Sequence, residues 1–211
     1  MQSKQVNTIF EYLGELFGAN PICEINYKSD IDLLVAIILS AQCTDKRVNV
    51  VTRELFKKYK TVGDYATADP KELQTAIHSC GFYRTKSANI IKMAQSVIRD
   101  HNGKIPANID CLTTLAGVGR KTANVFLGEY YKTPSLAVDT HVTRVSHRLN
   151  LSSGKTPEII ERDLMQIFDK KNWNDYHKYL VLFGRYYCKS QRPLCNDCKL
   201  CAQCAMIQHV S

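Results

Sequence analysis

Five cysteines near the end of the chain are the densest group of residues that could do chemistry. Cys188, Cys195, Cys198, Cys201 and Cys204 fall within 17 residues. Thiols this close favour a metal site, and compact Cys-x2-Cys spacing is typical of an iron–sulfur cluster. Zinc is an alternative, although zinc ribbons usually carry two well-separated Cys-x2-Cys pairs, and plain thiols are a third. Two sets of four fit the spacing, because either Cys188 or Cys201 can join the other three.

A glycine-rich turn is the second candidate. The stretch from Leu115 to Ala123 reads Leu-Ala-Gly-Val-Gly-Arg-Lys-Thr-Ala. Gly117 and Gly119 let the backbone turn tightly, and we expect a helix to begin near Gly119 or Arg120. Exposed amides at a helix start can bind phosphate without reading a base sequence. An ordinary helix hairpin has the same pattern, so the turn alone is weak evidence.

Lys121 lies in the first turn of that predicted helix. The positive end of the helix dipole, neighbouring Arg120 and partial burial would each favour the neutral amine, which is the nucleophilic form. Most lysines instead bind phosphate or are solvated. The pattern therefore marks Lys121 as a candidate nucleophile that needs support from elsewhere in the chain.

Asp139 belongs to the sequence Val-Asp-Thr-His at 138–141. It precedes a helix predicted over Thr140–Leu149, which places it at the N-cap. As a cap alone it would be structural. As a carboxylate directed toward Lys121, it could also stabilise a cationic sugar transition state or move protons. The two roles are compatible.

The elements that position these groups are predicted to be helices, and the fold class is all-α. Apolar residues recur at three- and four-residue intervals, whereas alternating strand patterns are scarce. The segment from Ile31 to Ser40 is apolar on every side, which predicts a buried central helix capped by Ser29-Asp30. Further helices are predicted over Asp45–Tyr59, over Pro70–His78, and over Tyr83–Asp100 with Ile90, Ile91, Ala94 and Val97 as its inner stripe.

Composition and charge limit the class of protein. The 211 residues are 45% hydrophobic and 23% charged, as in ordinary globular proteins. The formal net charge of +8 favours an anionic partner such as nucleic acid. No apolar run is long enough to span a membrane, and no apolar stretch of a secretory signal follows Met1. We therefore expect a cytoplasmic protein whose nine cysteines are thiols or metal ligands, not disulfides.

Four segments together resemble endonuclease III, a family of the helix-hairpin-helix glycosylase superfamily. They are the glycine-rich turn at 115–123, Val-Asp-Thr-His at 138–141, the cysteine-rich tail, and Leu-Ser-Ala-Gln-Cys-Thr-Asp at 39–45. The match is collinear and covers nearly the whole chain. It implies a two-lobed all-α fold. The lobes would be a six-helix barrel over 22–132, with the helix-hairpin-helix at about 109–130, and a second helical lobe from 1–21 and 133–211 with the cluster at 188–204.

The resemblance also implies a role for each candidate residue. Lys121 corresponds to the family's Schiff-base lysine and Asp139 to its essential aspartate. The family spacing selects Cys188, Cys195, Cys198 and Cys204 as ligands of a [4Fe-4S] cluster and leaves Cys201 as the spare. The residues expected to contact DNA are Gln42, which enters the gap left by a flipped nucleotide, Phe82, Gly117, Gly119, Arg120, and Lys189 and Arg192 in the basic loop at 189–194.

The activity implied is that of a bifunctional DNA glycosylase and AP lyase of base excision repair. Such an enzyme removes oxidised pyrimidines from duplex DNA and cuts 3′ to the abasic site by β-elimination. We expect a monomer whose partner is double-stranded DNA with damaged pyrimidines or abasic sites. The alternative is a non-catalytic DNA-binding module with a structural iron–sulfur cluster, which would have no use for Lys121 paired with Asp139.

Three positions depart from the family pattern. Ala116 stands where a proline is usual, and Cys80 and Phe82 flank Gly81 where branched aliphatics are usual. Phe82 still has the bulk and apolarity to wedge into a base stack. These changes leave the proposed chemistry intact and bear on wedge geometry and lesion preference.

Overall fold

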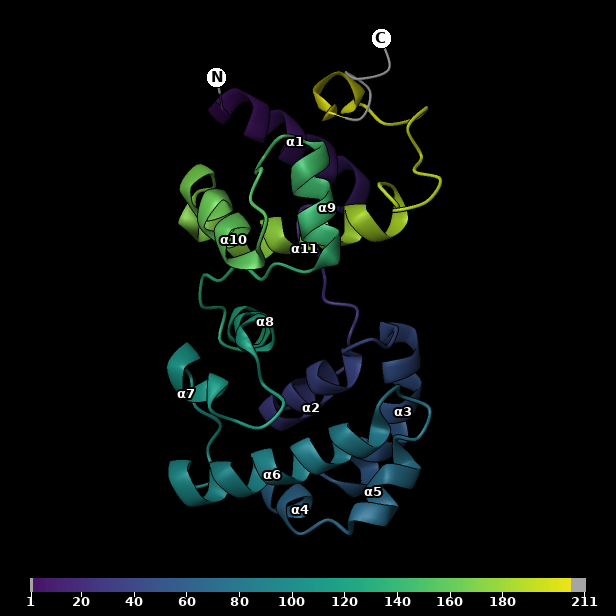
Figure 1. Cartoon of the computed structure of the whole chain (residues 1–211), viewed down its shortest axis with the longest axis vertical. Helices are drawn as coiled ribbons and strands as arrows, with labels where there is room; N and C mark the ends of the chain where they lie inside the picture. The colour runs from purple at the N-terminus through teal and green to yellow at the C-terminus, as the bar shows by residue number, and fades with distance from the viewer. Residues whose placement is uncertain (1, 206–211) are drawn as a thin grey trace. The chain divides into compact units, whose positions relative to one another are not determined.

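A computed structural model describes residues 2–205, and these residues form helices and loops without a strand (Figure 1). The predicted all-α class is therefore confirmed. No helix within 2–205 has the length and hydropathy to cross a membrane. The helices are α1 (Gln2–Phe17), α2 (Asp30–Ser40), α3 (Asp45–Lys58), α4 (Val62–Ala66), α5 (Pro70–Ala76), α6 (Tyr83–His101), α7 (Ile109–Thr113), α8 (Arg120–Tyr130), α9 (Thr140–Arg148), α10 (Pro157–Ile167) and α11 (Trp173–Tyr186), with two 3-10 helices, η1 (Lys170–Asn172) and η2 (Cys201–Gln203).

The chain divides into two compact units, each with its own hydrophobic core. One unit is Cys23–Lys132 and contains α2 to α8. The other joins Met1–Ile22 to Thr133–Ser211 and contains α1 and α9 to α11. The chain thus leaves the second unit after α1 and returns to it after α8.

Helix α2 is the centre of the unit Cys23–Lys132. Every residue from Ile31 to Leu39 is buried, because the helix is apolar on all sides and α3, α6 and α8 pack against it. A capping box starts it: the Ser29 hydroxyl accepts from the amide of Asp32 at 3.2 Å, and the Asp32 carboxylate accepts from the amide of Ser29 at 3.2 Å. The predicted buried central helix is confirmed.

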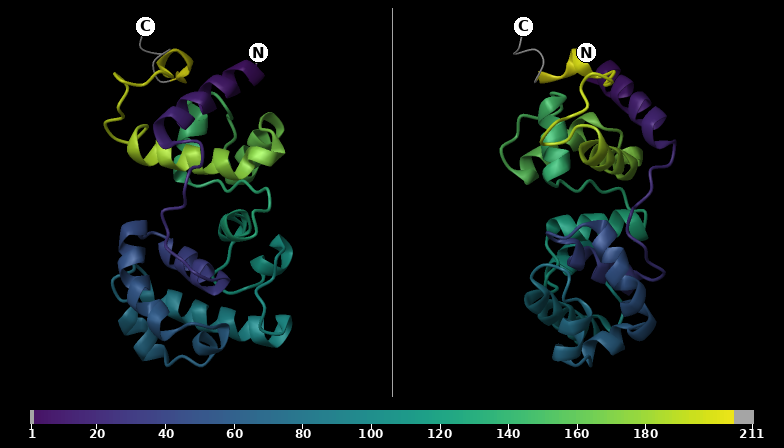
Figure 2. Two further views of the ribbon diagram at one scale, coloured as in Figure 1. Left: turned by 180° about the vertical axis from the view of Figure 1, so that it is seen from behind. Right: turned by 90° about the vertical axis from the view of Figure 1, so that its right-hand side faces the viewer.

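Helix α6 carries the other main apolar stripe of this unit. Its buried apolar residues are Ile90, Met93, Ala94 and Val97. The predicted stripe had Ile91 in place of Met93. Ile91 is only half-buried, because residues spaced by three and four positions share one helix face. The short helices α4 and α5 pack against α6, as the views in Figure 2 also show.

Predicted helix boundaries fall within two residues of those observed. Helix α2 begins one residue earlier than predicted, and α5 ends at Ala76, two residues before the predicted His78. The sequence patterns did not predict three of the observed α-helices, namely α4, α10 and α11.

The second unit has an aromatic core around Phe10 of α1. The Phe10 ring stacks on Tyr176 of α11, with centroids 3.7 Å apart, and meets the Phe168 ring edge-on at 5.1 Å. Helix α11 also packs against α9. That approach requires Gly184, because a Cβ there would lie 2.8 Å from the Cβ of His141.

Candidate functional site

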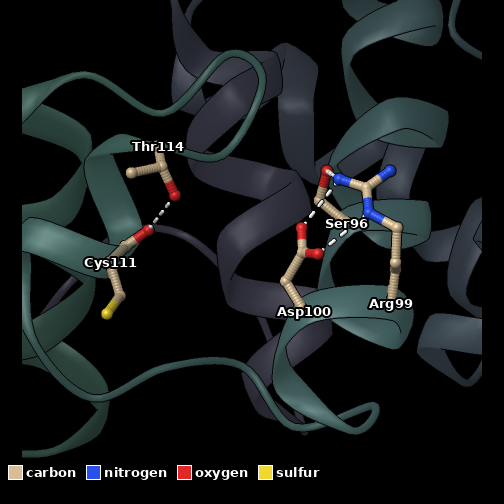
Figure 3. A network of polar contacts seen from close by, with 5 residues as sticks. All are labelled: Ser96, Arg99, Asp100, Cys111 and Thr114. Carbon is tan, nitrogen blue, oxygen red and sulfur yellow. Dashed lines mark hydrogen bonds and ion pairs between the residues drawn. The ribbon is translucent and has the colours of Figure 1, made fainter.

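The glycine-rich turn joins α7 to α8. After α7, the Thr114 hydroxyl donates to the carbonyl oxygen of Cys111 at 2.8 Å (Figure 3). Gly117 has φ +79°, a left-handed conformation, and an added Cβ would lie 3.0 Å from the Cβ of Asn89. Gly119 is the N-cap of α8 and has no side chain with which to cap the first amides. Both glycines are exposed, so the turn lies at the surface. Helix α8 begins at Arg120, where it was predicted to begin.

Lys121 is the second residue of α8, and its side chain is exposed. Arg120 beside it is exposed as well. The expectation of partial burial is therefore wrong. The buried face of α8 begins only at Ala123, so the core does not reach the first two residues.

Asp139 is the N-cap of α9, as predicted. Its Oδ1 accepts hydrogen bonds from the amides of His141 and Val142, each at 2.8 Å. The carboxylate is half-buried and follows the buried segment 135–138, so its position is well defined. Lys121 belongs to the unit Cys23–Lys132 and Asp139 to the other unit, and their pairing stays a prediction.

Arg144 and Arg148 of α9 hold the start of the cysteine-rich segment. Arg144 donates from Nε to the carbonyl oxygen of Cys188 at 3.0 Å and from Nη2 to that of Gly184 at 2.7 Å. Arg148 donates from Nη1 to the carbonyl oxygen of Lys189 at 2.7 Å and to Sγ of Cys188 at 3.3 Å. Neither arginine was predicted. The available signal is their four-residue spacing, which places both on one face of a helix.

All five cysteines of the tail line one pocket. Its other walls are mostly apolar and come from Arg148, Leu149, Phe183, Tyr187, Pro193, Leu194 and Leu200. The amide of Cys198 donates to the carbonyl oxygen of Cys195 at 3.2 Å, and the same three-residue step links Cys201 to Cys198 and Cys204 to Cys201. The segment is therefore a series of tight turns around its sulfurs. Burial raises the pKa of Cys198 to about 11. A backbone hydrogen bond from Leu200 lowers this pKa, and the neighbouring thiols, including Cys201 and Cys188, raise it.

This donor set suits a polynuclear iron–sulfur centre. Within residues 2–205, no group of three His, Cys, Asp or Glu side chains could hold a single metal ion. A cluster is larger than a single ion, so thiolates that would hold one can line a cavity without meeting at one point. The guanidinium beside Cys188 provides a positive partner for a thiolate. Cys201 differs, because its Sγ donates to the carbonyl oxygen of Cys195 at 2.9 Å, which requires a protonated thiol.

Gln42 and Phe82 lie on adjacent turns of the unit Cys23–Lys132. A Cβ on Gly81 would lie 3.5 Å from the carbonyl oxygen of Gln42. Both residues have left-handed backbones, with φ 52° and 57°. Both side chains are exposed, and that of Phe82 is 67% exposed. Non-glycine residues held in this conformation cluster at functional sites, and an exposed aromatic ring on such a turn is suited to insertion between bases.

Lys86 holds the turn that leads to Gln42. It is only 5% exposed, and its Nζ donates to the carbonyl oxygens of Leu39 at 2.8 Å and Ala41 at 2.7 Å. These carbonyls lie at the end of α2, where no further helical turn can satisfy them. Burial lowers the pKa of Lys86. The prediction missed this residue, although a charged residue four positions before Ile90 lies on the buried stripe of α6 and is itself a signal.

Both ends of the loop at 189–194 form backbone hydrogen bonds to one carbonyl group. The amides of Lys189 and Leu194 donate to the carbonyl oxygen of Tyr187 at 2.9 and 3.0 Å. Lys189 and Arg192 are both exposed, and Arg192 has a left-handed φ of 49°. The loop therefore presents two cations at the surface of the cysteine-rich segment.

Comparison with known proteins gives consistent matches along the chain. The family model described as HhH-GPD superfamily base excision DNA repair protein matches residues 35–170. The chain is similar to endonuclease III of Bacillus subtilis (strain 168), with 43% identity over 95% of this chain and 92% of that protein. It is also similar to a solved structure of a trapped endonuclease III–DNA covalent intermediate, with TM-score 0.94 and 40% identity over 99% of this chain and 98% of that one. A thermostable thymine-DNA glycosylase, 19% identical with TM-score 0.87 and covering 98% of each chain, shares the fold.

Proposed function

The chain belongs to the HhH-GPD superfamily of base excision DNA repair proteins and, within it, to the endonuclease III family, and on this premise we propose that it is a bifunctional DNA glycosylase and AP lyase. It removes oxidised pyrimidines from duplex DNA and cleaves the strand 3′ to the abasic site. The observation that carries this proposal is the similarity, over 99% of the chain, to an endonuclease III in a trapped covalent intermediate with DNA. The protein acts as a monomer in the cytoplasm.

Binding to the DNA backbone does not depend on base sequence. The turn at 117–119 and the start of α8 offer backbone amides to a phosphate, with Arg120 beside them. Lys189 and Arg192 contact phosphates from the loop at 189–194. The net charge of +8 supports this assignment, because neutralised phosphates release counterions and strengthen association.

The damaged base is buried in the duplex, so it must be extruded before any bond changes. An oxidised pyrimidine has lost aromaticity and stacks poorly, which lowers the cost of extrusion. Gln42 fills the gap that the nucleotide leaves, and Phe82 wedges into the stack beside it. Their exposure on adjacent, conformationally restricted turns supports these roles.

Lys121 then acts as the nucleophile. Its neutral amine attacks C1′ of the sugar, the C1′–N bond breaks, and the base leaves with the bonding electrons and takes up a proton. Loss of the amine proton and opening of the sugar ring give a Schiff base. That Schiff base acidifies C2′, and removal of a C2′ proton expels the 3′ phosphate by β-elimination. An exposed lysine at the start of a helix can reach a nucleotide held outside the duplex.

Asp139 stabilises the positive charge that develops on the sugar and moves protons during the reaction. The two amides that bind its Oδ1 limit rotation of the carboxylate, so the capping role and the chemical role use the same orientation. A carboxylate that is already oriented needs no rearrangement in the transition state.

Cys188, Cys195, Cys198 and Cys204 would hold the [4Fe-4S] cluster, and Cys201 is the spare. The hydrogen bond from the Cys201 thiol to a carbonyl supports its exclusion, because a ligand sulfur would be deprotonated. When bound, the cluster supplies cross-links that order the segment 188–204. Within that segment, the chain's own contribution is to present Lys189 and Arg192 to DNA.

Borohydride trapping on a duplex with one oxidised thymine tests the proposal. Wild type is compared with Lys121→Gln, with Asp139→Asn, which keeps a capping oxygen, and with Lys104→Gln, an exposed-lysine control. We expect a covalent protein–DNA adduct from wild type and the control, none from Lys121→Gln, and a rate reduced by about 10²–10⁴ for Asp139→Asn.

Two other outcomes would contradict the proposal in different ways. Base release without an adduct in wild type would indicate a glycosylase that uses water. Specific DNA binding with neither base release nor an adduct would indicate a non-catalytic binding module.

A further inference from the structure

Lys86 contacts the backbone of two turns that present exposed side chains to solvent. Its own side chain is only 5% exposed, and Nζ donates to the carbonyl oxygens of Leu39 at 2.8 Å and Ala41 at 2.7 Å. Ala41 directly precedes Gln42. The backbone amide of Lys86 donates to the carbonyl oxygen of Phe82 at 3.0 Å, at the start of α6. One residue thus holds the chain beside Gln42 through its side chain and the Phe82 carbonyl through its backbone.

The Gln42 turn (residues 40–43) and the Phe82 turn (residues 80–82) have backbone conformations that need outside support. Gln42 and Phe82 have left-handed φ values of 52° and 57°, which non-glycine residues keep only where the surrounding structure imposes them. The two turns also lie close together, because a Cβ on Gly81 would lie 3.5 Å from the carbonyl oxygen of Gln42. A residue bonded to both turns can therefore set their relative position.

Stability alone does not explain a lysine at the end of α2. Burial of a charge is costly, and a glycine turn or a neutral side chain could satisfy the carbonyl groups of a helix end. Within residues 2–205, the acceptors of the Lys86 ammonium are the two backbone carbonyls and no carboxylate. Charge-assisted hydrogen bonds are shorter and stronger than neutral ones, so they hold the end of α2 at a defined distance from α6.

We propose that Lys86 is a positioning residue for base extrusion, which fixes the Gln42 turn relative to the Phe82 turn so that both side chains enter the duplex together. Lys86 is buried and acts through the two turns, without contact to DNA. The consequence for base release rests on the proposed function, because it assumes that Gln42 fills the gap and Phe82 wedges into the stack. The positioning of the two turns does not depend on the later chemistry.

The spacing of DNA makes extrusion sensitive to this position. Successive bases of one strand are about 3.4 Å apart, so a shift of either turn by about 1 Å is a large fraction of the space into which a side chain must fit. In positioned sites, a displacement of about 1 Å can cost roughly a hundredfold in rate. An unpaired base costs less to extrude than a paired one, so it should depend less on Gln42 and Phe82.

Single-turnover base release on two duplexes tests the proposal. One duplex has an oxidised thymine opposite adenine, and the other has it opposite a site without a base. Lys86→Met should slow release from the paired duplex by roughly ten- to a hundredfold and release from the unpaired one far less. Lys92→Met, an exposed-lysine control on the same helix, should match wild type on both. An equal loss on the two duplexes would mean a general effect on the fold and would overturn the proposal.

Folding of the variants is checked by urea unfolding and by the absorbance of the iron centre. Lys86→Gln is prepared in parallel, because its shorter side chain keeps a neutral donor but cannot reach both carbonyl groups as the ammonium does. It should show the same contrast between the paired and the unpaired duplex if Lys86→Met does not fold.

Unstacking is measured without catalysis in the Lys121→Gln background. The duplex carries 2-aminopurine next to the oxidised thymine, and its fluorescence rises when the neighbouring stack opens. At saturating protein, Lys121→Gln should raise the fluorescence, whereas Lys86→Met/Lys121→Gln should bind the duplex and give only a small part of that rise. An equal rise in the two proteins would show that Lys86 does not position the turns for extrusion.

The two measurements separate this proposal from the proposed function. If wild type opens the stack but releases no base, the glycosylase and lyase function is rejected, and the fluorescence comparison still decides the role of Lys86. If wild type releases the base and Lys86→Met releases it equally fast from the paired duplex, the enzymatic function stands and the positioning role is rejected.

Discussion

The unit Cys23–Lys132 and the segment 188–204 are ordered by different means. In the unit, α2 is buried at every residue from Ile31 to Leu39, and large side chains such as Tyr65 and Phe126 are fully buried. Its stability therefore comes mainly from apolar surface removed from water. In residues 188–205, all of which the structure describes, only Leu200 is buried.

The cysteine-rich segment has polar anchors and tight turns instead of a core. Arg144 and Arg148 bind the backbone of Cys188 and Lys189, and three successive turns follow. Backbone hydrogen bonds at the surface contribute little net free energy, because water competes for them. With the proposed cluster in place, the segment would depend on the group that its thiols bind, whereas the unit is ordered by its own core.

The largest expected effect is loss of the cluster. We expect Cys204→Ala to lose the visible absorbance of thiolate-bound iron and Cys201→Ala to keep it, because only Cys204 is assigned as a ligand. For structural zinc peptides, metal binding contributes on the order of 10 kcal/mol of folding free energy, so the segment should become open to trypsin at Lys189 and Lys199. Urea unfolding of the unit should be little changed. Loss of colour in Cys201→Ala alone would reverse the ligand assignment.

The next effect concerns the core of the unit. Phe126 is fully buried in α8, and Phe126→Ala should lower the free energy of unfolding by about 3–5 kcal/mol while the iron absorbance remains. Ile98→Ala is the control. Ile98 is 45% exposed, so this substitution should lower the free energy of unfolding far less. Both are measured by urea denaturation. An equal loss of iron in Phe126→Ala would show that the two regions do not fold separately.

A smaller effect is expected at Lys86, where the unit depends on a polar group. Lys86→Met removes the group that donates to the carbonyl oxygens of Leu39 and Ala41. The loss of these hydrogen bonds should lower the free energy of unfolding by about 1–3 kcal/mol. Lys92→Met, on an exposed part of the same helix, is the control. Hydrogen exchange of the amides that follow α2 should increase only in Lys86→Met. No change there would mean that Lys86 does not hold the Gln42 turn.

A feature of either region could be predicted from the sequence when the residues that cause it are close together in the chain. The buried α2, the glycine turn and the Asp139 cap were predicted correctly, because a short stretch of sequence contains their cause. The exposure of Lys121 was not, since it depends on how far the core extends along α8.

The residues that the patterns missed make contacts between distant parts of the chain. Lys86 binds the end of α2, and Arg144 and Arg148 bind a segment 40 or more positions away. Nothing near these residues in sequence specifies a partner. The ligand set of the tail was ambiguous from spacing, and the Cys201 hydrogen bond is what distinguishes that thiol in the structure.

The smallest expected effect is a pH dependence at His141 of α9, next to Arg144, which holds the start of the cysteine-rich segment. Burial, as the largest cause, lowers the pKa of His141 below its usual 6.5, and the charges of Arg144 and Arg185 lower it further. The Asp139 carboxylate and a hydrogen bond with the Gly184 backbone raise the pKa, but only in part. The unfolded chain therefore binds the proton first as the pH falls, so stability is full above about pH 6.5 and declines as the pH falls through the lowered value.

The slope cannot exceed about 1.4 kcal/mol per pH unit for one proton, and partial exposure of the ring reduces it. Protonation also makes Nδ1 a donor, so it can no longer accept from Nη2 of Arg144, 3.2 Å away. His141→Gln should remove this component from urea unfolding measured between about pH 5 and 8. If wild type and variant have the same pH profile, α9 does not couple the protonation of His141 to the anchor of the cysteine-rich segment.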